Sequence, residues 1–153
     1  MIKFFFYLTL NLFLSTFSFS KDIDIQKNIR ISFKCELEKK IIKNSEYNYQ
    51  IFLAKDLDEK DLEKFEIISK QPEKLLINGL SLFLSQSEKL DVKIVSKDIV
   101  LFKSIDKKKN YSESGIITFK SGELIHEITR NLNSENSEKD ITFYLCKKKE
   151  AKV

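Results

Sequence analysis

The chain has 153 residues, with 27 lysines and arginines against 23 aspartates and glutamates, for a formal net charge of +4. Charges of both signs are interspersed, and the lysine runs at 107–109 and 147–149 lack the interleaved aromatic residues of a single-strand nucleic-acid site. We therefore expect no nucleic-acid partner. Three glycines exclude a glycine-rich phosphate loop, and no G-x-S-x-G motif surrounds any serine.

The first 20 residues have the order of an export signal. A positive start, Met1–Lys3, precedes an apolar run from Phe4 to Leu14 and a stretch with small residues. Ser18 and Ser20 occupy the −3 and −1 positions of a cleavage site. We predict a signal peptide at 1–20, cleaved after Ser20, and an exported, periplasmic protein without a membrane span; the alternative is an uncleaved N-terminal anchor.

The next segments predict strands. Residues 29–38 alternate apolar and polar side chains, which predicts a strand with one buried face that includes Cys35. Residues 47–53 alternate in the same way. Residues 56–64 break the period and begin with a capping-box pair, Asp56 and Glu59, so we predict a short helix or helical turn there.

Several more apolar runs follow, each bounded by turn residues. Asn78-Gly79 and Ser121-Gly122 are typical of tight turns between strands. Asp106–Glu113 is expected to be a charged loop, and 131–140 a polar loop. The runs that we expect to be strands are 65–69, 75–77, 80–84, 90–96, 99–105, 115–120, 123–129 and 141–146.

This pattern predicts an all-β fold. About eight short antiparallel strands must curl into a barrel or pack as a two-sheet sandwich to bury one face. We expect a linker at 21–28, one β domain at 29–148 and a basic disordered tail at 149–153. Apolar residues such as Leu101 and Ile51 fall on the face opposite to the core residues, which favours a second sheet, a partner or a membrane face on that side.

The two cysteines, Cys35 and Cys146, predict one disulfide in an exported chain. The bridge would close a loop of about 110 residues, for which the chain-entropy model allows about 4–5 kcal/mol. Pairing of the first strand with the last would bring the cysteines together and close the barrel. The pattern leaves open whether the bridge lies inside or at a rim, and two buried thiols are the alternative.

Few residues suggest chemistry. The single histidine, His126, lies on the strand face of Leu124 and Ile128, where a buried structural role is the simplest interpretation. Arg130 offers planar bonding to a carboxylate or phosphate. We expect no catalytic set, no cofactor and no metal site, because no general base, acid and nucleophile come together and two cysteines with one histidine do not complete a zinc site.

The expected function is non-enzymatic binding of a small apolar or amphipathic ligand inside the barrel. The candidate contacts are His126, Arg130, Tyr47 and Tyr49, because aromatic residues are spread over most strands. The alternative is an envelope protein that interacts with or inhibits another protein through its outward apolar residues. An enclosed cavity would favour the first function, and a filled core with an exposed apolar patch would favour the second.

Overall fold

A computed structural model describes residues 30–70, 74–87 and 90–149 of the chain. Nine strands and two short helical segments make up the described part. The elements are β1 (Arg30–Lys43), β2 (Gln50–Leu53), the 3-10 turn η1 (Ala54–Asp56), β3 (Leu62–Lys70), β4 (Lys74–Asn78), α1 (Leu82–Ser85), β5 (Asp91–Ser96), β6 (Ile99–Asp106), β7 (Tyr111–Thr118), β8 (Glu123–Arg130) and β9 (Glu138–Lys148).

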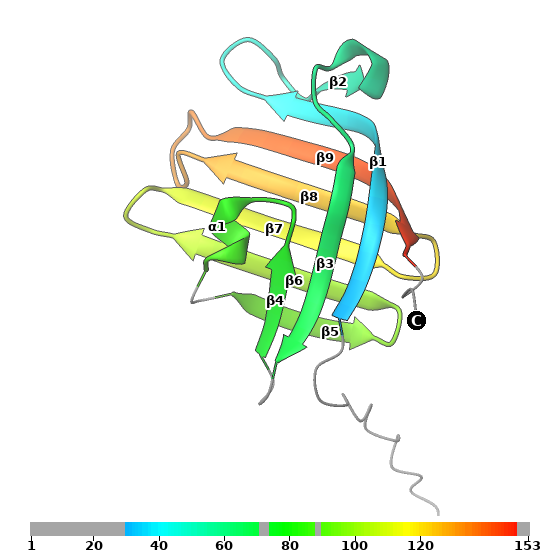
Figure 1. The fold of residues 1–153 in the computed structure, drawn as a ribbon. Helices are drawn as coiled ribbons and strands as arrows, with labels where there is room; N and C mark the ends of the chain where they lie inside the picture. The colour runs from blue at the N-terminus through cyan, green and yellow to red at the C-terminus, as the bar shows by residue number, and fades with distance from the viewer. Residues whose placement is uncertain (1–29, 71–73, 88–89, 150–153) are drawn as a thin grey trace, which may run out of the picture.

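The strands form one antiparallel sheet in the order β4-β3-β1-β9-β8-β7-β6-β5, with β2 added beside β1. The sheet curls so that β3 and β4 cross in front of β5–β8, and it forms a nearly closed barrel of eight strands (Figure 1). The two ends of the strand order, β4 and β5, border the seam. The prediction of an all-β antiparallel fold is confirmed, and of the two predicted forms, barrel or sandwich, the structure has the barrel.

Strands β1 and β9 hold the centre of this sheet. They pair along ten positions, and Cys35 lies directly opposite Cys146, to which it is joined by a disulfide. Both cysteines are buried, so the bridge lies inside the barrel. The predicted pairing of cysteines is confirmed, but β1 and β9 are neighbours in mid-sheet, so the bridge does not close the barrel.

The core fills the space between the crossing layers. Phe65 of β3 and Ile77 of β4 are fully buried in the same cluster as Phe102 of β6 and Ile117 of β7. The rings of Phe33 and Phe65 lie 5.7 Å apart between centroids, so aromatic side chains pack against one another inside the barrel. The inward positions of successive strands therefore supply the core, as their period of two requires.

The helical segments differ in detail from the prediction. The expected turn near 56–64 is η1, which begins at Ala54, and Leu62 already belongs to β3. Asp61 accepts a hydrogen bond from the Leu37 backbone N–H at 2.8 Å, next to the bulge of β1 between Leu37 and Lys39. The acidic stretch thus stabilises the irregular part of β1, because the Asp61 carboxylate accepts a hydrogen bond from the β1 backbone.

The expected strand at 80–84 is wrong, because this stretch contains α1. Ser81 accepts a hydrogen bond from the Leu84 backbone N–H at 3.1 Å and caps the helix, while Leu84 is buried. Gly79, with φ of +93°, therefore joins β4 to a helix and not to a strand. Gly122, with φ of +78°, does lie in a hairpin, between β7 and β8.

Neither helical segment in the described ranges has the length and apolar character needed to cross a membrane. The predicted signal peptide (1–20) and linker (21–28) lie outside the described residues, as does the expected tail beyond residue 149.

The disulfide generates the first prediction. Replacement of both Cys35 and Cys146 by alanine should lower the free energy of unfolding by about 2–5 kcal/mol, because the open chain gains entropy when it unfolds. Urea unfolding followed by circular dichroism measures the loss, with the chemically reduced wild type as the matched control. An unchanged unfolding midpoint in both proteins would show that the bridge adds no stability.

Candidate functional site

The histidine that the sequence singled out lies inside the barrel. His126 and Leu124 lie on the inner face of β8, and the exposed fraction of His126 is only 6%. Its Nε2–H donates to Oε2 of Glu113 on β7, at 3.0 Å. The prediction that His126 is buried on the same face as Leu124 is thus confirmed, and the hydrogen-bond partner of His126 is a carboxylate.

Glu113 is the centre of a buried hydrogen-bond cluster that we call the Glu113 cluster: Ser81, Tyr111, Glu113 and His126. The Glu113 side chain is 1% exposed and accepts three hydrogen bonds, from His126, from the Tyr111 hydroxyl and, at 2.6 Å, from the Ser81 hydroxyl. Ser81 caps α1, and the ring of Phe83 packs edge-on against Tyr111. The cluster therefore attaches α1 to strands β7 and β8.

Burial and hydrogen bonding act in opposite directions on Glu113. Burial alone would raise its pKa, but the hydrogen bonds from His126, Ser81 and Tyr111 favour the charged form, and the net pKa is lowered. Burial and the neighbouring Glu113 charge raise the pKa of Tyr111. The cluster thus contains an ionised carboxylate that accepts from a neutral phenol.

The Glu113 cluster lacks the order of contacts that activates a nucleophile. A serine nucleophile needs a base in hydrogen-bond contact with its hydroxyl. Here Ser81 and His126 both bond to Oε2 of Glu113, and the carboxylate stands between them. The Ser81 oxygen also accepts from the backbone of α1. This geometry is that of a structural anchor.

Arg130, the second predicted contact, ends strand β8 and forms an ion pair. Its Nη1 donates to Oδ2 of Asp140 on β9 at 3.1 Å, and Lys40 of β1 lies 3.7 Å from the same oxygen. Asp140 is largely buried, whereas the Arg130 side chain is 44% exposed. The carboxylate that binds Arg130 thus comes from Asp140 of the same chain, whereas we expected it to come from a ligand.

Tyr47 and Tyr49 lie in the connection between β1 and β2, not within a strand. Tyr47 packs edge-on against Phe52, with ring centroids 5.3 Å apart, and Tyr49 is half-exposed with a positive φ. Strands β1 and β9 separate β2 from β8, which carries His126 and Arg130. The structure does not assemble the four predicted contacts into one site.

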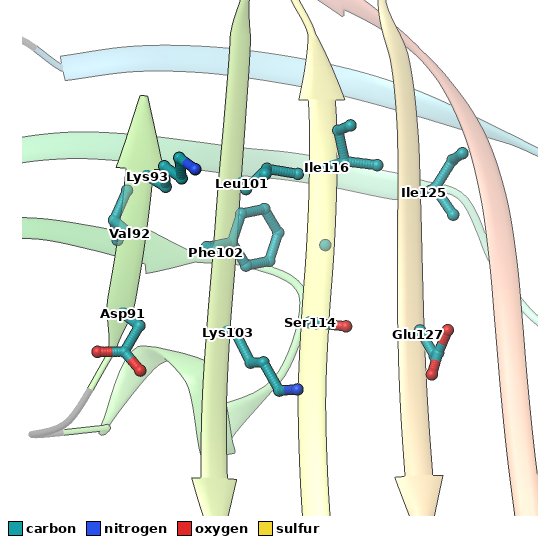
Figure 2. Close-up of a pocket in the computed structure, with 11 residues that line it drawn as sticks. Asp91, Val92, Lys93, Leu101, Phe102, Lys103, Ser114, Ile116, Ile125 and Glu127 are labelled. Carbon is teal, nitrogen blue, oxygen red and sulfur yellow. The ribbon is translucent and has the colours of Figure 1, made fainter. Parts of the chain in front are cut away.

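The described residues instead form a groove on the outer face of the barrel. It has a volume of about 420 Å³ and crosses strands β5 to β8. Figure 2 shows two rows of outward side chains that border it. The first, which we call the apolar row, consists of Leu101, Ile116 and Ile125 and ends at Lys93. The second, which we call the polar row, consists of Asp91, Lys103, Ser114 and Glu127.

Strand register builds both rows. Leu101 pairs with Ile116, and Ile116 pairs with Ile125, so their side chains stand next to one another across three strands. Lys103, Ser114 and Glu127 pair in the same way two residues further along. Between the rows, Gly115 lies beside Phe102, where a Cβ would come within 2.2 Å of a ring carbon. Glycine is therefore required for the Phe102 ring to pack here.

The apolar row continues beyond the groove. Ile125 pairs with Phe143 of β9, and a second groove of about 230 Å³ shares Ile116 and Ile125 with the first. The Lys39 ammonium lies 4.6 Å from the centroid of the Phe143 ring, within cation–π distance. We use "outer groove" for the first hollow alone, and the second extends its apolar surface towards β9.

Sequence reasoning missed Glu113, because it assigned this residue to a charged loop. The signal was present: Tyr111, Glu113, Gly115 and Ile117 alternate, and they are the inward positions of β7. The outward position of Leu101 was recognised, but the register that joins Leu101 to Ile116 and Ile125 needs long-range pairing.

Within the described residues, no group of three or more His, Cys, Asp or Glu side chains is placed to hold a metal ion. Comparison with known proteins finds no match to a family model, a curated protein or a solved structure.

The Glu113 cluster generates the second prediction. Glu113→Gln should lower the free energy of unfolding by about 1–3 kcal/mol near neutral pH, because the amide cannot accept the same three donors. The pKa of Glu113 is lowered on folding, so its contribution is complete above its ordinary value of 4.5 and disappears as the pH falls through the lowered pKa. The stability gap between wild type and variant should therefore narrow from about pH 6 to about pH 3.

Urea unfolding at a series of pH values measures that gap. The exposed Glu135, changed to Gln, is the matched control and should leave stability within about 0.5 kcal/mol of wild type. A gap that stays constant down to the lowest pH would contradict the role given to the Glu113 charge.

Proposed function

We propose that this is an exported, non-enzymatic binding protein that recognises a partner protein through the outer groove. The observation that supports this most is the apolar row, because Leu101, Ile116 and Ile125 form a continuous apolar surface on the outside of a barrel whose inward residues form a buried core. An apolar groove flanked by polar side chains resembles the core and rim of protein interfaces.

An open groove suits a protein partner better than a small molecule. Small ligands are bound in concave sites that bury most of their surface. The outer groove is open along the face of the sheet, so a partner must bring its own surface to cover it. The inner positions, where we expected a small apolar ligand, hold buried side chains of the core cluster such as Phe65 and Phe102.

The polar row adds selectivity to this interface. Glu127 accepts hydrogen bonds from Lys139 and Thr129, at 3.1 and 3.0 Å, and so is held in place at one end of the row. Lys103 and Asp91 stand at the other end. A partner segment with apolar side chains on one side and charges of both signs on the other fits the two rows.

The disulfide supports the proposed export. Disulfides persist in oxidising compartments, and the Cys35–Cys146 bridge joins two strands that the chain forms at its two ends. Together with the predicted signal peptide at 1–20, this bridge points to the periplasm or cell envelope as the place where the partner is met.

Photo-crosslinking tests the proposed function. A benzophenone amino acid at Lys103, on the rim of the outer groove, should give a specific protein adduct in the cells that make the protein. Ile116→Lys in the same chain should reduce the adduct by about fivefold or more, because the charge interrupts the apolar row. Mass spectrometry identifies the adduct, and circular dichroism checks that the variant is folded.

The control places the benzophenone at Leu82, which is 76% exposed on α1. That position should not give the same adduct. An equal adduct from Leu82, or an adduct that Ile116→Lys leaves unchanged, would contradict recognition through the outer groove.

A further inference from the structure

Strand β5 is an open edge with apolar side chains on both faces. Within the described ranges it pairs only with β6, and it ends the strand order. Ile94 points inwards, opposite Val100, yet it is 41% exposed, and Val95 is 52% exposed. An edge of this kind offers unpaired backbone groups to another strand.

The residues of this edge are arranged symmetrically about Val92. Residues 90–94 read Leu-Asp-Val-Lys-Ile, so an apolar residue, an acid, an apolar residue, a base and an apolar residue follow one another. When two such strands pair antiparallel with Val92 opposite Val92, Asp91 of each copy faces Lys93 of the other. Leu90 of each copy then faces Ile94 of the other. Both sets of contacts occur twice, as an isologous interface requires.

Neighbouring registers lack this complementarity. A register centred on Asp91 places two aspartates opposite each other, and one centred on Lys93 places two lysines opposite each other. Like charges directly opposite in a sheet are unfavourable. The bulge of β5, between Ile94 and Ser96, lies beyond the paired segment and ends the regular edge there.

The flanking strand strengthens the charge pattern. Asp91 already lies opposite Lys103 of β6 in its own chain. In the register centred on Val92, it would stand between Lys103 and Lys93 of the second copy, on the outer face. The inner face would bring Leu90 of the second copy over the exposed side of Ile94.

We infer that β5 is a dimerisation edge, at which two copies of the chain pair antiparallel about Val92 and join their sheets. The occupant of this edge is thus a second copy, recognised by two reciprocal pairs of Asp91 with Lys93. Because Asp91 and Lys93 also border the outer groove, the dimer places the two grooves end to end. This inference does not depend on the partner proposed for the groove.

A charge swap tests the dimer. Sedimentation equilibrium of the disulfide-bonded protein should show a monomer–dimer equilibrium. Asp91→Lys and Lys93→Asp, made singly, should each raise the dissociation constant by about tenfold, since each creates two like-charge pairs. The double variant, Asp91→Lys with Lys93→Asp, should return it to within about threefold of wild type, because the pairs reform with reversed signs.

A cysteine pair reports the register directly. A mixture of Asp91→Cys and Lys93→Cys chains, whose exposed side chains would face each other in this register, should be joined into a covalent dimer by a short bis-maleimide, whereas Ser114→Cys, in mid-sheet on β7, should not. A protein that stays monomeric at all concentrations would overturn the inference. The inference would also be overturned by single variants that dimerise like wild type, or by a double variant that dimerises no better than the single ones. Equal crosslinking at Ser114 would overturn it too.

Discussion

The pairing of β1 with β9 is the interaction on which the rest of the structure depends. It joins the first and the last described strands along ten positions, and the Cys35–Cys146 bridge lies at one of them. Every other described strand is attached to this pair on one side or the other: β2, β3 and β4 beyond β1, and β8 to β5 beyond β9. Strands β1 and β9 are far apart in the sequence, so their pairing is a long-range contact of the kind that slows folding.

A consequence of this arrangement is that the barrel has its seam between β4 and β5. Helix α1 follows β4 in the chain, and the Glu113 cluster attaches it to β7 and β8. A buried charge is costly unless hydrogen bonds compensate for it, and Glu113 receives three. Burial of Glu113 thus secures α1 against the barrel, while β5 pairs with β6 alone among the described strands.

Strands β6 to β9 also carry apolar side chains on both faces, beside the polar residues described above. Their inward residues make the core, and the outward Leu101, Ile116, Ile125 and Phe143 make a surface that folding alone does not need. Burial of such side chains in a complex would be favourable by about 25 cal/mol for each Å² removed from water. This is why we place recognition on the outside of the barrel and stability on the inside.

Local pattern predicted much of this fold. The strict alternation of residues 29–38 identified β1 and turned Cys35 inwards, and the face that His126 shares with Leu124 was correct. The failures have two different causes. The stretch at 80–84 contains a helix whose local capping bond, from the Leu84 backbone N–H to Ser81, the apolar pattern did not reveal. Glu113 was assigned to a charged loop because two of its three donors, Ser81 and His126, come from other segments of the chain.

The candidate site was less predictable than the fold, because its residues come together only through the pairing of strands. Leu101, Ile116 and Ile125 lie on three strands, and only their register makes one row of them. Tyr47 and Tyr49 lie far from His126 because they precede β2, which β1 and β9 separate from β8. Asn44 accepts hydrogen bonds from the Glu46 and Tyr47 backbone N–H groups and turns the chain there. Short-range alternation therefore indicates which face a residue occupies, and pairing decides which residues meet on it.

Native mass spectrometry of the protein purified from its own cells tests the central claim, that the inside of the barrel is packed and binding takes place outside. The account predicts a native mass equal to one or two copies of the chain, each with two hydrogens fewer than the reduced form and with no small molecule. A tightly held small molecule that leaves only when the protein is denatured would contradict it, because the ligand would then occupy the interior.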